Sequence, residues 1–150
     1  MKKIFILIII IVMSIVMIMF AKYSEFTHSQ NKIKSINKEF LAYEESTIQI
    51  NKIVTLMNRA IVLNRSNNIR QNENKIFEEN DTNSIKIYLE TKSTKDEALV
   101  KVPMEELILS NKSSIEKVEY AFADVKFKMT EKEYHKKTGQ IKKIVFTEQN

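Results

Sequence analysis

The amino-terminal part of the chain is apolar on every side, whereas the rest alternates between apolar and polar positions. Residues 4–21 form an unbroken apolar run whose one polar residue is Ser14, and thirteen of them are Ile, Leu, Val or Phe. As a helix this run spans about 27 Å, close to the ~30 Å hydrocarbon core of a bilayer. Its side chains favour membrane insertion by about 4 to 8 kcal/mol. The pattern therefore predicts a transmembrane anchor over residues 1–22, in contact with the lipid bilayer through residues 4–21.

A cleaved signal peptide is the alternative interpretation of the same segment. Met1-Lys2-Lys3 is a suitable basic start, but the apolar run exceeds the usual ~7 to 15 residues. The exit sequence Met19-Phe20-Ala21 also has a bulky residue where a small one is expected. We therefore predict an uncleaved signal anchor.

Lysines lie on both sides of the run, so the positive-inside rule does not decide its orientation. A short basic stub followed by a long carboxyl-terminal domain usually places that domain outside. We expect a single-pass cell-membrane protein whose carboxyl-terminal domain is extracytoplasmic.

Residues 23–45 contain no proline or glycine, so the helix can continue out of the membrane as an amphipathic stalk. Apolar residues and one serine recur in a heptad-like seam, at Phe26, Ser29, Ile33, Ile36, Phe40 and Tyr43. Two uses of this seam stay open. The seam either packs against the protein's own domain, or it binds a second copy of the chain in a homo-oligomer or an envelope protein partner.

Residues 46–150 are predicted to form one domain of the α+β class. A core helix begins near Ser46, where Ser46 and Gln49 fit a capping box, and it ends near Asn64 before an asparagine-rich loop. Alternating positions then predict an antiparallel sheet of about five strands, and two short helices interrupt it. The predicted strands are 75–78, 84–90, 98–102, 125–130 and 141–147, and the predicted helices are 103–109 and 113–122. The first three strands form a meander, and the last two form a hairpin with its return at Gly139.

Composition narrows the chemistry. One glycine excludes the glycine-rich phosphate cradles, and the absence of cysteine excludes disulfides, thiolate metal sites and thiol nucleophiles. Ser114 and Lys117 with Lys137-Thr138-Gly139 match short motifs of penicillin-binding serine enzymes, but about 105 residues cannot build that fold. We expect Lys137-Thr138-Gly139 to be a hairpin loop. The sequence predicts no enzyme, no catalytic residue and no cofactor.

Two further sets of side chains carry candidate binding chemistry. Glu131, Glu133 and His135 share one strand face at i, i+2, i+4 and could hold a divalent ion, although a solvated strand end is the preferred interpretation and we predict no metal. Residues 124–150 contain seven lysines against four acids, within a net charge of +5 for the chain. Lys126, Lys128, Lys142 and Lys143 could contact a polyanion such as anionic lipid or wall polymer. Nucleic acid is an unlikely partner because this segment has no arginine and at best Tyr134 as an exposed aromatic.

The architecture of an apolar helix, an amphipathic continuation and a carboxyl-terminal sheet resembles that of type IV pilins and pseudopilins. The chain lacks their processing motif, because no glycine precedes Gly139 and no acid lies between Met1 and Phe20. The stretch from Asn80 to Ile87, with Tyr134-His135 and Thr138-Gly139 before Ile144-Val145-Phe146, is similar to small uncharacterised single-span membrane proteins of low-GC Gram-positive bacteria. That resemblance implies no activity.

Together these observations predict a membrane-anchored, non-enzymatic interaction or structural module that faces outward, for example as a component of an envelope or pilus-like assembly. The alternative is an extracytoplasmic sensor or polyanion-binding module that uses the lysine-rich hairpin.

Overall fold

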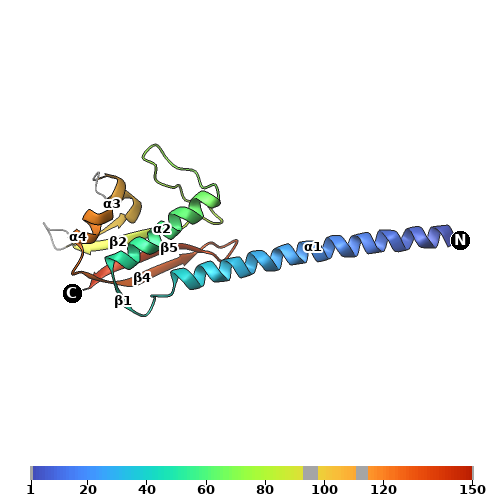
Figure 1. The fold of residues 1–150 in the computed structure, drawn as a ribbon, viewed down its shortest axis with the longest axis horizontal. Helices are drawn as coiled ribbons and strands as arrows, with labels where there is room; N and C mark the ends of the chain where they lie inside the picture. The colour runs from blue at the N-terminus through green and yellow to red at the C-terminus, as the bar shows by residue number, and fades with distance from the viewer. Residues whose placement is uncertain (1, 93–97, 111–114, 150) are drawn as a thin grey trace. The chain divides into compact units, whose positions relative to one another are not determined.

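The computed structural model describes residues 2–92, 98–110 and 115–149. It contains two compact units, Met1–Ser35 and Ile36–Asn150. The first unit is helical and the second contains the sheet (Figure 1).

Helix α1 (Lys2–Phe40) begins in the first unit and contributes its last turn to the second. Its segment from Ile6 onward is long and apolar enough to cross a membrane, and none of its most apolar stretch is buried. The one polar side chain of the apolar run is satisfied locally, because Ser14 Oγ donates a hydrogen bond to the Ile10 carbonyl at 2.9 Å. The predicted long apolar helix is confirmed. No break separates the segments predicted as anchor and stalk, but the helix ends five residues before the predicted end of the stalk.

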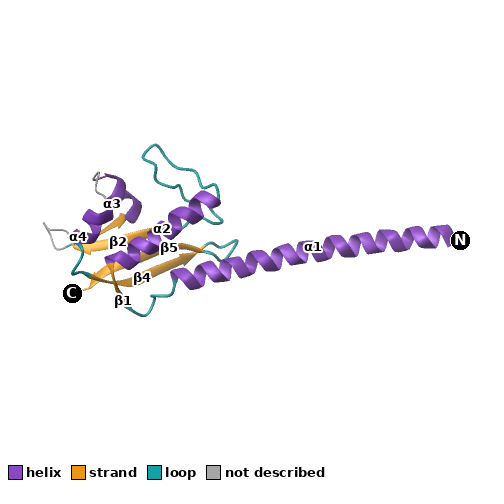
Figure 2. Cartoon of the chain, in the orientation of Figure 1, coloured by secondary structure: helices purple, strands orange, loops and turns teal. Residues whose placement is uncertain are grey.

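The second unit is built on one five-stranded sheet in the order β1-β4-β5-β2-β3 (Figure 2). The strands are β1 (Thr47–Gln49), β2 (Lys86–Lys92), β3 (Leu99–Pro103), β4 (Lys126–Tyr134) and β5 (Ile141–Gln149). The α+β class and a sheet of five strands are confirmed, although β1 is not among the predicted strands. The expectation of a wholly antiparallel sheet is wrong, because β2 and β5 are parallel while the other three pairings are antiparallel. The chain between β2 and β5 brings β5 alongside β2 in the same direction. Alternation of apolar and polar residues shows which face of a strand is buried, but it does not show the direction of the neighbouring strand.

Helix α2 (Ile50–Ser66) is the predicted core helix and covers one face of this sheet (Figure 1). The predicted capping box is wrong: Gln49 is the N-cap and makes no side-chain capping hydrogen bond. Residues 47–49 instead extend the sheet, since Ile48 is buried opposite Phe127. Burying an Ile side chain yields about 1.5 to 3 kcal/mol, which exceeds the ~1 kcal/mol of a typical cap.

The hydrophobic core lies between α2 and the sheet. It contains Ile53 and Met57 of α2 together with Phe127 and Phe146 of the sheet. Ile36 and Phe40 of α1 belong to the same core, and Tyr43 packs against it. The carboxyl-terminal part of the heptad-like seam thus packs against the protein's own domain. Phe26, further up the helix, is 62% exposed, and self-association through that part of the seam stays a prediction.

Two short helices, α3 (Met104–Ser110) and α4 (Ile115–Ala121), lie between β3 and β4. Their ends lie within one or two residues of the predicted helices 103–109 and 113–122. Residues 113 and 114 lie outside the described ranges. The predicted strand 75–78 does not form. Lys75 has a positive φ of 62°, and the Asn72 side chain accepts hydrogen bonds from the backbone N–H groups of Asn74 and Ile76. This local turn leaves only an isolated bridge between Gln71 and Phe77, because asparagine competes with strand pairing.

Candidate functional site

The four lysines predicted to contact a polyanion lie at two separate ends of the β4–β5 hairpin. Lys126 and Lys128 are exposed and stand opposite Gln149 and Thr147. Lys143 stands opposite Glu133, near the turn that joins the strands. The structure therefore does not gather the four into one patch. Lys126 and Lys128 form no ion pair within the part of the chain that the structure describes.

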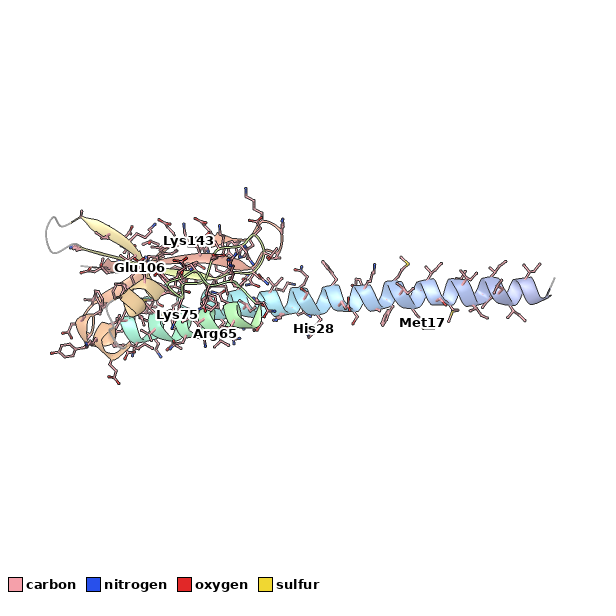
Figure 3. All side chains as sticks on the ribbon, turned by 90° about the horizontal axis from the view of Figure 1, so that it is seen from above. Met17, His28, Arg65, Lys75, Glu106 and Lys143 are labelled. Carbon is pink, nitrogen blue, oxygen red and sulfur yellow. The ribbon has the colours of Figure 1, made fainter. Side chains whose placement is uncertain are left out.

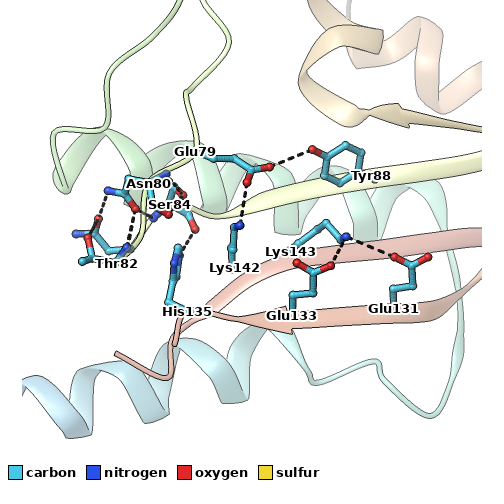
Figure 4. A network of polar contacts seen from close by, with 11 residues as sticks. Glu79, Asn80, Thr82, Ser84, Tyr88, Glu131, Glu133, His135, Lys142 and Lys143 are labelled. Carbon is cyan, nitrogen blue, oxygen red and sulfur yellow. Dashed lines mark hydrogen bonds and ion pairs between the residues drawn. The ribbon is translucent and has the colours of Figure 1, made fainter. Parts of the chain in front are cut away.

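Carboxylates hold the other two lysines in place. Lys142 Nζ lies 3.0 Å from Glu79, and Lys143 Nζ lies 3.5 Å from Glu131 and also contacts Glu133 (Figure 4). Glu131 accepts a further hydrogen bond of 2.7 Å from Lys101 on β3. These acids come from two segments of the chain, the loop before β2 and strand β4. The local charge near the turn is therefore largely compensated.

The ion pairs shift the pKa values of their members. The hydrogen bond from Lys142 lowers the pKa of Glu79, and the hydrogen bond from Lys101 lowers the pKa of Glu131. The hydrogen bond to Glu79 raises the pKa of Lys142, and the hydrogen bond to Glu133 raises the pKa of Lys143. Every shift favours the charged form, as expected for groups that stabilise one another across a strand.

This network covers an apolar residue on the sheet face that lies opposite the main core. Val145 stands in register with Tyr88 and Glu131 and is 0% exposed, yet it does not belong to the core under α2. Partial burial raises the pKa of Tyr88, whose hydroxyl lies 3.5 Å from Glu79. The polar face is therefore an ordered layer of side chains over Val145 and not a row of freely solvated charges.

At the end of the hairpin, His135 joins the turn to the loop before β2. The His135 ring is 3% exposed, and its Nε2 lies 2.7 Å from the Ser84 carbonyl. A carbonyl only accepts, so Nε2 carries the proton. Thr138 Oγ1 donates to the Thr82 carbonyl at 2.6 Å, and Gln140 Nε2 donates to the Asn83 carbonyl at 3.1 Å. Three side chains of the turn thus fasten one loop.

The loop that they fasten is ordered by Asn80. Its Oδ1 accepts hydrogen bonds from the backbone N–H groups of Thr82, Asn83 and Ser84 at 2.9 to 3.1 Å (Figure 4). These bonds fold residues 80–83 into a tight turn. Asparagine suits this role because its short side chain reaches the N–H groups that follow it.

The structure does not bring Glu131, Glu133 and His135 together as a metal site. Both carboxylates face Lys143, whereas the His135 ring is turned to Ser84. Over the described ranges no group of three or more His, Asp or Glu side chains could hold a metal ion.

A pocket of about 400 Å³ opens beside this turn. Its charged lining includes Asp81 and Glu133 as well as Lys136, Lys137 and Lys142. Because this lining carries charges of both signs, the pocket suits a polar ligand better than an apolar one. The nearby Ser84 hydroxyl does not present a free nucleophile, because Ser84 is fully buried and its Oγ accepts a hydrogen bond from Asn80 N–H.

Lys137-Thr138-Gly139 lies in the turn between β4 and β5, with Gly139 at a φ of +72°. The predicted hairpin loop is confirmed, since a positive φ favours glycine. Ser114, the other half of the motif match, lies outside the described residues.

Sequence patterns missed three polar side chains that organise the domain. Fully buried Asn64 exchanges two hydrogen bonds with the backbone of Ile85, at 2.9 and 2.8 Å. Asn37 makes the same kind of pair, donating to the Gly139 carbonyl at 2.8 Å and accepting from Ile141 N–H at 2.7 Å. The signal for Asn64 is its place on the apolar stripe of α2, where a polar residue needs a partner.

The third is Lys86, which forms a buried ion pair of 3.1 Å with Glu105. Glu105 also accepts a hydrogen bond of 3.2 Å from Phe77 N–H. No sequence signal links residues so far apart.

No family model, curated protein or solved structure matches the chain.

Proposed function

We propose that this protein is a single-span, membrane-anchored interaction or structural module without enzymatic activity, and that its carboxyl-terminal domain faces outward. One observation carries the anchoring. The most apolar stretch of α1 is entirely unburied, and the apolar residues from Ile6 to Phe20 expose their side chains all around the helix (Figure 3). A helix of a water-soluble protein buries at least one apolar face, whereas lipid can cover all of them.

The domain that follows supports a binding role. Its polar sheet face is held in one arrangement by the ion pairs of Glu79, Glu131 and Glu133. Ordered side chains lose little conformational entropy when a partner binds, so such a face suits recognition. An envelope or pilus-like assembly is the form of this role that the resemblance in architecture favours.

Protease accessibility tests the placement. A tag fused after Asn150 should be removed from intact cells by external protease while the membrane stays sealed. A tag that is degraded only in lysates would place the domain on the other side. Recovery of the chain from the culture medium, beginning near Lys22, would contradict the anchor itself.

Cross-linking in intact cells tests the interaction role. We expect a covalent product with a second copy or with an envelope protein. Recovery of the monomer alone, with cross-linkers that reach both the stalk and the polar face, would count against this role.

Polyanion binding is a second candidate function, and it is favoured by Lys126 and Lys128, which pair with no acid in the described part of the chain. The substitution pair Lys126→Gln with Lys128→Gln should weaken a salt-sensitive association with anionic vesicles or wall polymer. Lys142→Gln with Lys143→Gln should weaken it less, because those charges are already compensated. Equal binding by wild type and all variants would end this hypothesis.

A further inference from the structure

A small pocket outside the polar face combines an apolar floor with a cationic rim. It lies between α2, α3 and the loop that follows α2, and it has a volume of about 170 Å³. Met57, Ile61, Phe77 and Ile108 supply apolar lining, and Arg65 and Lys75 supply positive charge. Figure 3 labels Arg65 on α2 and Lys75 on the loop.

The volume limits what the pocket can hold. An apolar cavity of about 150 Å³ accommodates one benzene molecule. The pocket therefore has room for one aromatic ring or a short alkyl chain. A larger apolar body would have to displace Met57 or Phe77, which are both buried.

The charges decide the rest of the ligand. Arg65 and Lys75 are exposed and form no ion pair with any residue in the described ranges. Glu105 also lines the pocket, but Lys86 neutralises its carboxylate at 3.1 Å. The net charge of the lining is positive. A guanidinium presents a fork that matches a carboxylate in two parallel hydrogen bonds.

The loop that carries Lys75 has a defined conformation. Lys75 has a φ of 62°, a left-handed value that non-glycine residues seldom adopt. Gln71 Nε2 donates to the Lys75 carbonyl at 2.9 Å, and Lys75 N–H donates to the Asn72 carbonyl at 2.9 Å. These bonds fix the backbone from which the ammonium group reaches the rim.

We infer that this pocket binds a small amphipathic carboxylate, with an aryl or short alkyl body on the Met57, Ile61, Phe77 and Ile108 floor and its carboxylate between Arg65 and Lys75. This inference goes beyond the anchoring role and does not depend on it. An arylalkanoate such as 3-phenylpropionate has the required size and charge. Its neutral amide lacks the charge, and acetate lacks the apolar body.

Calorimetric titration of the full chain in lipid nanodiscs, with empty nanodiscs as reference, tests the proposal. Because a ligand of this size binds weakly, the titration extends to about 10 mM. We expect saturable binding of 3-phenylpropionate, and binding about tenfold weaker for 3-phenylpropanamide and for acetate. The absence of saturable binding, or equal affinity for the acid and its amide, would overturn the proposal.

Two variants and a matched control locate the site. Arg65→Gln with Lys75→Gln should weaken 3-phenylpropionate about tenfold or more, and Ile61→Phe should weaken it by filling the pocket. Lys52→Gln with Lys117→Gln removes the same charge at two exposed positions elsewhere and should leave the affinity unchanged. The urea midpoint of each variant, measured by pulse proteolysis, identifies any that unfold. Equal loss in the control pair would show binding to overall charge and refute the assigned site.

Discussion

The buried ion pair between Lys86 and Glu105 gives the sharpest test of how the domain is held together. Their side chains are only 7% and 9% exposed, and Nζ lies 3.1 Å from the carboxylate. At this distance two unit charges attract by about 5 kcal/mol for an effective dielectric constant of about 20. The cost of removing both charges from water is of similar size, so the net contribution of the pair is small.

Removing one partner is different, because the other charge stays buried without compensation. Lys86→Met should lower the free energy of unfolding by about 3 to 5 kcal/mol. Adding Glu105→Gln should restore most of this loss, because a neutral amide at position 105 needs no cation. The amide oxygen can still accept the hydrogen bond that Glu105 now takes from Phe77 N–H.

Pulse proteolysis in urea measures these changes on the full chain in mild detergent, because protease cleaves the unfolded domain. The exposed pair Arg59–Glu39, at 3.0 Å and 42% and 43% exposed, is the matched control. Arg59→Met should cost at most about 1 kcal/mol. If Lys86→Met costs no more than Arg59→Met, or if the double variant is as unstable as the sum of the singles, the reasoning about burial is wrong.

Three further predictions concern the anchor, the core and the polar face. Substituting arginine for Ile8, Ile11 and Ile15 should make membrane insertion of the apolar run less favourable by about 8 to 12 kcal/mol, which is more than the run provides. Alkaline extraction should then release the variant from the membrane fraction. A variant that stays in the membrane pellet like the wild type would contradict the anchor. Asn64→Ala should lower the free energy of unfolding by about 2 to 4 kcal/mol, because it leaves the buried N–H and C=O of Ile85 unpaired. A urea midpoint of unfolding near the wild-type value would refute this prediction. The pKa of Glu79 is lowered in the folded state, so its contribution to stability is present above the ordinary value of 4.5 and is lost as the pH falls through the folded value. In the Glu79→Gln variant, the free energy of unfolding should therefore fall less on acidification than in the wild type, by a difference of less than about 1 kcal/mol. The same pH dependence in both proteins would argue against the pair with Lys142.

The parts of the fold that follow local patterns could be predicted from the sequence. The alternation of Phe127 and Met129 with lysines indicated β4, and the apolar stripe from Ile50 to Ala60 indicated α2. Gly139 marked the turn of the hairpin. Each of these signals lies within a few residues, where chain geometry alone fixes which side chains share a face.

The failures occur where distant contacts override local preference. Residues 46–49 have the spacing of a capping box, but the burial of Ile48 against Phe127 draws them into the sheet. The parallel pairing of β2 with β5 depends on the path of the whole chain between them.

The candidate site shows the same limit. The concentration of lysines in residues 124–150 could be found from the sequence, but the acid that pairs with Lys142 could not. Glu79 lies 63 positions from Lys142 in the sequence, since 142 − 79 = 63. A cluster of like charges in sequence therefore says little about net charge in space until the partners from other strands are known.

The paired hydrogen bonds of Asn37 have a mechanical consequence. They connect the last turn of α1 to Gly139 and Ile141, on either side of the point where the chain enters β5. A force applied along α1 would reach the central strands of the sheet through this amide and through Phe40, before it strained the loop at residues 41–46. A tether that pulls on the middle of a sheet loads several strands together, and such an arrangement resists traction better than one that peels a single strand from an edge.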